Sequence, residues 1–247
     1  MDVMSSLTGL RRDGRKPEEV RDILCQFGCA EGADGSVLYQ LGNTKILATV
    51  VGPADAGEND DEEGDLELLE EPSGLDCHFK LSSFSQSDRK SGKGDDPRSE
   101  EYAEYMEMCY KMIMFPHKTA ESVVKVTCQV LQTDGSHLAA ALTAGTLALI
   151  DAGIPIKDII VACSATITDG KPIVDIASHE ESHKLPQLTV AAIPRTREVV
   201  VLDTKNRFHK DLFNPLLNAA LDGCQKVFED VEKIVREHVK QSDPLLI

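Results

Sequence analysis

Positive charge is scarce in this chain of 247 residues. It carries 26 Lys and Arg against 42 Asp and Glu, which gives a formal net charge of −16. This balance disfavours broad binding to polyphosphate, because such binding depends on cationic groups that displace condensed counterions. Any contact with a nucleic acid must therefore be confined to a local basic segment.

Paired cysteines and long apolar runs are also missing. The seven cysteines are scattered singly without a CxxC pair, so we expect neither a disulfide framework nor a zinc ribbon, and a reducing compartment is indicated. No run approaches the ~18 apolar residues of a membrane span, and residues 1–10 lack the basic flank and apolar core of a secretory signal. We expect a soluble intracellular protein with no membrane partner.

Common catalytic motifs are absent, with one apparent exception. There is no GxSxG elbow and no Walker loop. His179-Glu180-Glu181-Ser182-His183 does satisfy HExxH, which in metalloproteases places two zinc ligands and a general base on one helical face. Pro186, however, stands where that helix would have to continue. We therefore expect a polar loop with two solvated histidines and no metal site.

Hydrophobic periodicity is present, and the 41% apolar content is enough to bury a core. Strands are predicted at residues 23–31, 36–41, 45–51, 75–84, 122–131, 159–167, 173–176, 188–193 and 198–202. Helices are predicted at residues 102–113, 136–152 and 215–240. Many connections are too short for crossovers, so the pattern favours antiparallel pairing and an α+β fold.

The same pattern suggests an internal duplication. Strands followed by a helix occur in both halves, so we predict one domain over residues 1–247 with similar halves at 10–118 and 119–247. The long helix near the C-terminus closes the second half. Residues 58–71 are so rich in Asp and Glu that they are predicted to form a solvated acidic loop.

Two segments could meet a phosphate group. Asp134-Gly135-Ser136-His137 joins a strand to a helix, where free backbone N–H groups and the helix dipole favour an anion. The same residues also fit an ordinary capped helix start. Residues 85–98 form the one loop dense enough in cations to meet an RNA backbone, although three aspartates offset them.

Five ordered motifs carry a resemblance. They are LRRDGR at residues 10–15, ADGS at 33–36, GNTK at 42–45, VLQTDG at 130–135 and LIDAGIP at 149–155. Together they resemble the RNase PH family of 3′-5′ exoribonucleases over nearly the whole chain. The resemblance implies the RNase PH fold, with two similar halves of mixed sheet and helices.

Within that family the chain is similar to ring subunits of the eukaryotic RNA exosome. The resemblance implies a ring of six RNase PH-like subunits, RNA-binding cap subunits, separate hydrolytic nucleases and single-stranded RNA in the channel. It also implies a location in the nucleus, nucleolus and cytoplasm. The resemblance assigns a role on the RNA backbone to Arg89, Lys90 and Arg98.

Active members use phosphate to release nucleoside diphosphates, and their phosphate-binding segment matches Gly135, Ser136 and His137 here. His137 replaces an arginine, and a histidine that is mostly neutral near pH 7 lacks the fixed fork of donors that holds phosphate. The catalytic aspartates match Glu181 and Gln187, and a neutral glutamine cannot act as an acid. The resemblance thus implies a degenerate site with no cofactor. The alternative is an active phosphorolytic enzyme working through Glu181, Ser136 and His137, and Mg²⁺ is expected only in that case.

Overall fold

A computed structural model describes most of the chain. The described residues are 10–55, 74–86, 97–115, 122–168, 170–183, 185–207 and 209–242. The predicted acidic loop, Arg89 and Lys90 lie outside these ranges. Within them, no helix combines the length and apolarity that crossing a membrane requires.

Five strands form the first sheet, in the order β1-β2-β3-β5-β4. Their bounds are β1 Ile23–Phe27, β2 Gly35–Leu41, β3 Thr44–Asp55, β4 Leu75–Leu81 and β5 Ser122–Gln132. The first three form an antiparallel meander, in agreement with the short connections between them. In contrast, β4 and β5 are parallel, because α1 (Pro97–Ile113) lies between them in sequence and supplies the length of a crossover.

Four antiparallel strands form the second sheet, in the order β7-β6-β8-β9. Their bounds are β6 Val161–Thr168, β7 Lys171–Val174, β8 Gln187–Ile193 and β9 Glu198–Lys205. The division between the sheets comes later in the chain than the predicted boundary at residues 118 and 119. The reason is that β5 pairs with β3 and β4 and so completes the first sheet.

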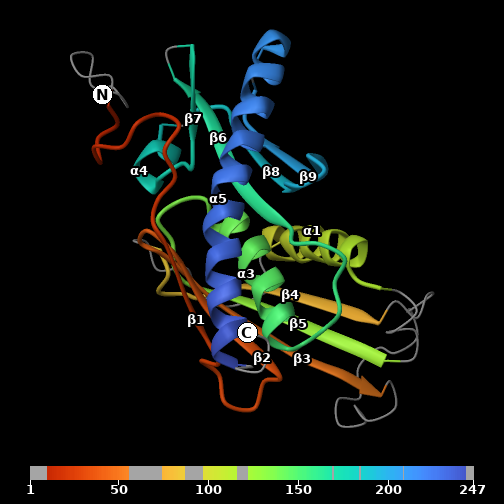
Figure 1. Cartoon of the computed structure of the whole chain (residues 1–247). Helices are drawn as coiled ribbons and strands as arrows, with labels where there is room; N and C mark the ends of the chain where they lie inside the picture. The colour runs from red at the N-terminus through yellow and green to blue at the C-terminus, as the bar shows by residue number, and fades with distance from the viewer. Residues whose placement is uncertain are drawn as a thin grey trace.

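Three long helices join the two sheets, and Figure 1 shows α5 running past both of them. The buried α3 (His137–Asp151) packs on β2, β3, β5 and β6. Its buried alanines and its glycine permit this close packing, because their side chains are small. α5 (Phe213–Ser242) follows the short turn η2 (Lys210–Leu212), covers β6, β7 and β8, and reaches β1. α1 contacts β4 of one sheet and β9 of the other. The mixed α+β architecture is thus confirmed, with the start of α3 where the sheets meet.

Candidate functional site

The turn between β5 and α3 is held in a conformation that only glycine suits at its centre. Gly135 has φ +80°, and a Cβ there would collide with the backbone carbonyl oxygen of Ile176 and lie 2.7 Å from the carbonyl carbon of Ala177. Ser136 follows with φ +54°. The left-handed turn therefore lets the segment after β7 lie directly against the start of α3.

Neighbouring motifs clamp this turn from the side of the first sheet. The hydroxyl of Thr44 accepts from the Asp134 N–H at 3.0 Å and donates to the Gly135 carbonyl at 3.0 Å. The Arg21 guanidinium donates to the Asp134 carbonyl at 2.6 Å. Two of the motifs that carry the family resemblance, GNTK and VLQTDG, thus meet at one point.

Ser136, one of the residues expected to hold phosphate, already has partners within the protein. The hydroxyl of Ser136 donates to the Ile176 carbonyl at 2.8 Å and contacts the hydroxyl of Ser164. The backbone N–H of Ser136 donates to a carboxylate oxygen of Glu181 at 3.3 Å. The anion at the start of α3 is therefore the protein's own Glu181, which the helix dipole favours there.

Glu181 is held at this place by α4 (Ser178–Glu181), the short helix between β7 and β8. Burial raises the pKa of its carboxyl, and the hydrogen bond from Ser136 and the charges of Lys205 and Arg21 offset only part of that rise. Glu181 consequently keeps a proton at a higher pH than an ordinary glutamate does.

His137 is the first residue of α3, and its ring lies among aromatic side chains. The ring centroids of His137 and Tyr102 are 5.7 Å apart in an edge-on arrangement, and the centroid of Phe79 is 6.4 Å from that of His137. The imidazole thus packs between α1 and β4. The predicted role in holding phosphate remains a prediction.

Gln187 begins β8 and is buried, with 7% of its surface exposed. It shares a face of the sheet with Thr189, which pairs with Ser164 of β6. Because Ser164 contacts Ser136, this face is the one that looks toward the start of α3. The structure therefore brings the two predicted positions, Glu181 and Gln187, to the same side of the second sheet.

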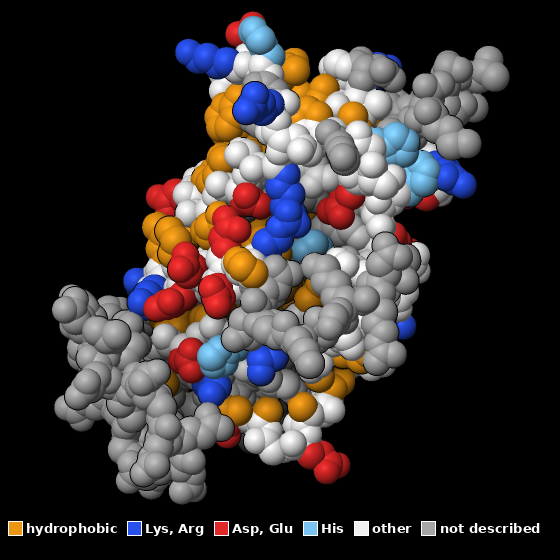
Figure 2. Space-filling model, turned by 180° about the vertical axis from the view of Figure 1, so that it is seen from behind, with side chains coloured by type: hydrophobic (Ala, Val, Ile, Leu, Met, Phe, Trp, Pro, Cys, Tyr) orange, Lys and Arg blue, Asp and Glu red, His pale blue; other side chains and the backbone are white. Residues whose placement is uncertain are grey.

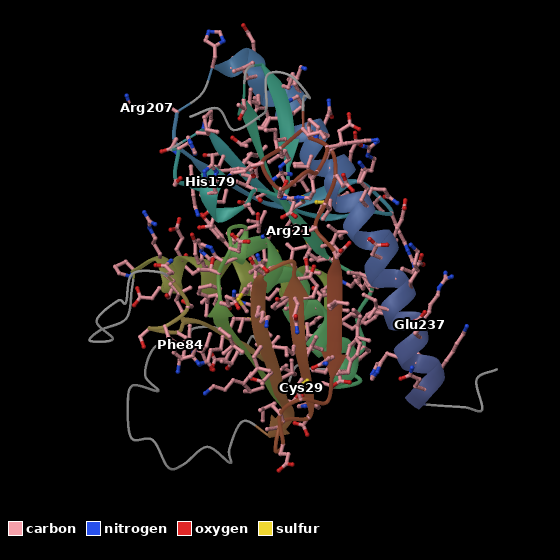
Figure 3. All side chains as sticks on the ribbon, turned by 90° about the vertical axis from the view of Figure 1, so that its left-hand side faces the viewer. Arg21, Cys29, Phe84, His179, Arg207 and Glu237 are labelled. Atoms are coloured by element: carbon pink, nitrogen blue, oxygen red, sulfur yellow. The ribbon has the colours of Figure 1, made fainter. Side chains whose placement is uncertain are left out.

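A buried ion pair that no sequence motif predicted, Arg21 with Asp175, lies next to the turn. The carboxylate of Asp175 accepts from Nε of Arg21 at 2.8 Å and from its Nη2 at 2.7 Å, and Arg15 lies 3.1 Å away. Burial alone would raise the pKa of Asp175, but the hydrogen bonds and charge of Arg21, with help from Arg15, hold it below its ordinary value. Figure 3 shows Arg21 where the two sheets meet.

A second buried pair anchors α4. The Arg11 guanidinium donates to both carboxylate oxygens of Glu180, with 2.8 Å between Nε and Oε1, and it also binds the carbonyls of Val174 and Asp175 at 2.7 Å. The LRRDGR motif thus fastens the helix that carries Glu181.

The HExxH segment has a different geometry from that of a metalloprotease. It begins as a single helical turn rather than the expected loop, and α4 ends at Glu181. Glu180 forms an ion pair with Arg11, and Nδ1 of His183 is hydrogen-bonded to the His179 carbonyl oxygen at 2.8 Å. Across the described residues, no group of three or more His, Cys, Asp or Glu side chains is arranged to hold a metal ion.

An open hollow of about 550 Å³ lies beside α4. Its lining includes charges of both signs, among them Arg12, Arg15, Glu19 and Asp134. Glu181, Gln187 and His137 are not part of the lining, but Arg21 and Asp134 are, so this hollow borders the turn before α3.

Of the three basic residues expected on RNA, the structure describes Arg98. It is exposed in the first turn of α1. Burial raises the pKa of Asp203 on β9, and the positive charge of Arg98 opposes a small part of that rise. The first turn of α1 therefore borders the candidate site.

Comparisons with known proteins agree with this architecture. The family description "3′ exoribonuclease family, domain 1" matches residues 19–155, and "3′ exoribonuclease family, domain 2" matches residues 158–223, both as RNase PH domains. The exosome complex component RRP41 of Homo sapiens is 33% identical over 238 residues, which cover 96% of this chain and 95% of the human protein.

Two solved structures share the fold. Rrp46 of rice (Oryza sativa) has a TM-score of 0.75 at 22% identity, covering 91% of this chain and 100% of that one. A chain of the Archaeoglobus fulgidus exosome, solved with RNA bound to the active site, also has a TM-score of 0.75 at 22% identity, covering 90% and 92%. With both family domains in order and a full-length relative above 30% identity, the chain belongs to the RNase PH family of 3′ exoribonucleases.

Proposed function

We propose that this chain is a non-catalytic ring subunit of the RNA exosome. In this role it assembles with other RNase PH-like subunits into a six-membered ring and guides single-stranded RNA through the channel. Cap subunits bind RNA at the entrance, and separate hydrolytic nucleases cut it, in the nucleus, nucleolus and cytoplasm. Support for the assembly comes from relatives along the full length that are named as exosome components.

The main support for a non-catalytic role is the hydrogen bond from the Ser136 N–H to Glu181. A phosphate that approached this N–H would meet a carboxylate of the same sign of charge. His137, packed against Tyr102 and Phe79, does not restore the fixed positive charge that an arginine would bring. Gln187 carries a neutral amide, which is too weak an acid to protonate a leaving group.

Assembly is tested by co-purification under native conditions followed by mass measurement of the intact complex. We expect one copy of this chain in a ring with related but different chains. A chain that is recovered alone, or only as copies of itself, would contradict the assembly.

The alternative, a phosphorolytic 3′-5′ exoribonuclease, is favoured by one observation. Burial raises the pKa of Glu181, and a general acid needs a pKa nearer to neutral pH than that of an ordinary glutamate. In this alternative Glu181 would protonate the leaving oxygen while phosphate attacked the RNA 3′ end.

Phosphate-dependent release of nucleoside diphosphates from end-labelled RNA separates the two functions. In reconstituted rings that contain either the native chain or Glu181→Ala, we expect the same background release. A family member with both catalytic aspartates serves as the positive control. Release that requires phosphate and disappears in Glu181→Ala would refute the non-catalytic role and leave the assembly intact.

A further inference from the structure

Lys205 lies at the candidate site, although no sequence motif pointed to it. It is the last residue of β9 and pairs in register with Gln187 of β8. Residues directly opposite one another on neighbouring strands point to the same face of a sheet. Asp203, two residues earlier on β9, shares that face. An ammonium, an amide and a carboxylate therefore stand together on the side that looks toward α3.

Tyr102 of α1 fixes where the ammonium lies. Nζ of Lys205 is 5.6 Å from the centroid of the Tyr102 ring, and that ring is edge-on to His137. Tyr102 itself is buried, with 4% of its surface exposed. Figure 2 shows this face of the molecule, on which acidic side chains gather over α1 next to basic side chains and a histidine.

The positive charge of Lys205 acts on two carboxylates. Burial raises the pKa of Glu181 and of Asp203, and in both cases the positive charge of Lys205 opposes the rise. The charge of Lys205 therefore reaches one carboxylate on α4 and another on the same face of β9. A positive charge near acidic groups reduces their attraction for a second cation.

The described residues do not fit a divalent metal ion at this place. Magnesium and manganese are held chiefly by oxygen ligands such as carboxylates, and a positive charge close to those ligands repels them. Here one oxygen of Glu181 accepts from the Ser136 N–H, Gln187 offers a neutral amide, and Lys205 stands opposite Gln187 on the neighbouring strand.

We propose that Lys205 is the resident cation of this site, which neutralises Glu181 and Asp203 and thereby excludes a divalent metal ion. The proposal goes beyond the function as a ring subunit, because it concerns which ion the site accepts. It holds for the chain alone as well as for the ring.

The test is a titration of the purified full-length chain with Mn²⁺, with free Mn²⁺ followed by electron paramagnetic resonance. Lys205→Met should bind Mn²⁺ at least about tenfold more tightly than the native chain, because a unit charge near a divalent ion is lost. Gln187→Asp alone should gain little, since the new carboxylate would pair with Lys205. The double variant Gln187→Asp/Lys205→Met should bind most tightly.

Three controls locate the effect. Lys205→Arg keeps the charge and should behave like the native chain, and Lys171→Met removes an exposed lysine of β7 and should also leave Mn²⁺ binding unchanged. The site gained in Lys205→Met should vanish in Lys205→Met/Glu181→Gln. Circular dichroism establishes that each variant is folded.

Two outcomes would overturn the proposal. One is tight Mn²⁺ binding by the native chain that Glu181→Gln abolishes. The other is a folded Lys205→Met and a folded double variant that bind Mn²⁺ no better than the native chain, or that keep the gain after Glu181 is replaced. None of these results bears on whether the chain assembles into a ring, so the two proposals fail independently.

Discussion

At the scale of single residues, Gly135 and Gly153 allow steric conflict to be separated from backbone strain. Both have positive φ, +80° and +71°, but a Cβ at Gly153 meets nothing within 4 Å, whereas one at Gly135 meets the backbone of residues 176–178. Gly135→Ala should lower the free energy of unfolding by at least about 3 kcal/mol and Gly153→Ala by about 1 kcal/mol. Urea denaturation measures both. Equal losses would show that close approach does not select glycine at position 135.

Asp175 should make stability depend on pH in a defined direction. Its pKa is held below the ordinary value of 3.8, so its contribution is complete above that pH and is lost as the pH falls through the lowered pKa. Asp175→Asn should lower the free energy of unfolding by about 3 kcal/mol at neutral pH, because Arg21 keeps its burial and loses its charge partner. Urea unfolding from pH 7 to pH 3 should show this difference constant at first and smaller below pH 3.8. A difference that does not shrink in acid would contradict the ion pair.

At the scale of elements, α4 depends on the N-terminal segment for its position. The side chain of Arg11 is 0% exposed and that of Glu180 is 6% exposed. Glu180→Gln should lower the free energy of unfolding by about 3 kcal/mol, because it leaves a buried guanidinium without its carboxylate. The double variant Arg11→Met/Glu180→Leu should lose less free energy of unfolding than Arg11→Met and Glu180→Leu do in sum. Each single variant leaves one buried charge unpaired, and the double variant leaves none.

The same variants test whether α4 carries Glu181 as a unit. The matched control is Lys233→Ala, which breaks the exposed pair of Lys233 with Asp230 on α5 and should produce no measurable change. In Glu180→Gln, proton exchange at the Ser136 amide should also become faster, because Glu181 no longer sits firmly against it. Unchanged exchange would mean that α4 is held by other contacts.

Most elements could be predicted from the sequence, because each strand and helix shows its own periodicity. The apolar residues spaced along 102–113 predict α1, and Gly42-Asn43, which favour a tight turn, predict the β2–β3 hairpin. The side-chain contacts and strand registers that join distant elements could not be predicted from periodicity. Arg21 and Asp175 are 154 positions apart, and Lys205 faces Gln187 only because of the register of β8 and β9. Glu181, Gln187 and the turn at Gly135 came from the family motifs, and their contacts came from the structure.

At the scale of the whole molecule, the net charge of −16 decides how RNA binding should respond to salt. An acidic protein gains no general attraction to a polyanion, so affinity must rest on a few local cations. The basic segment 85–98 supplies three candidates, of which Arg98 lies in the first turn of α1 rather than in the predicted loop. This distribution predicts few phosphate contacts and a shallow dependence of affinity on salt.

The loop variant Arg89→Ala/Lys90→Ala/Arg98→Ala should weaken RNA binding by a reconstituted ring and shorten the protected RNA. For single-stranded RNA, the loss of three phosphate contacts should reduce the slope of log affinity against log salt by about two. The matched control, Lys233→Ala/Arg236→Ala/Lys240→Ala, removes the same charge from α5. Filter binding at several salt concentrations and nuclease protection measure both effects. Equal losses in the two variants would show that overall charge governs binding, whereas a loss confined to the loop variant would place RNA on that side of the molecule.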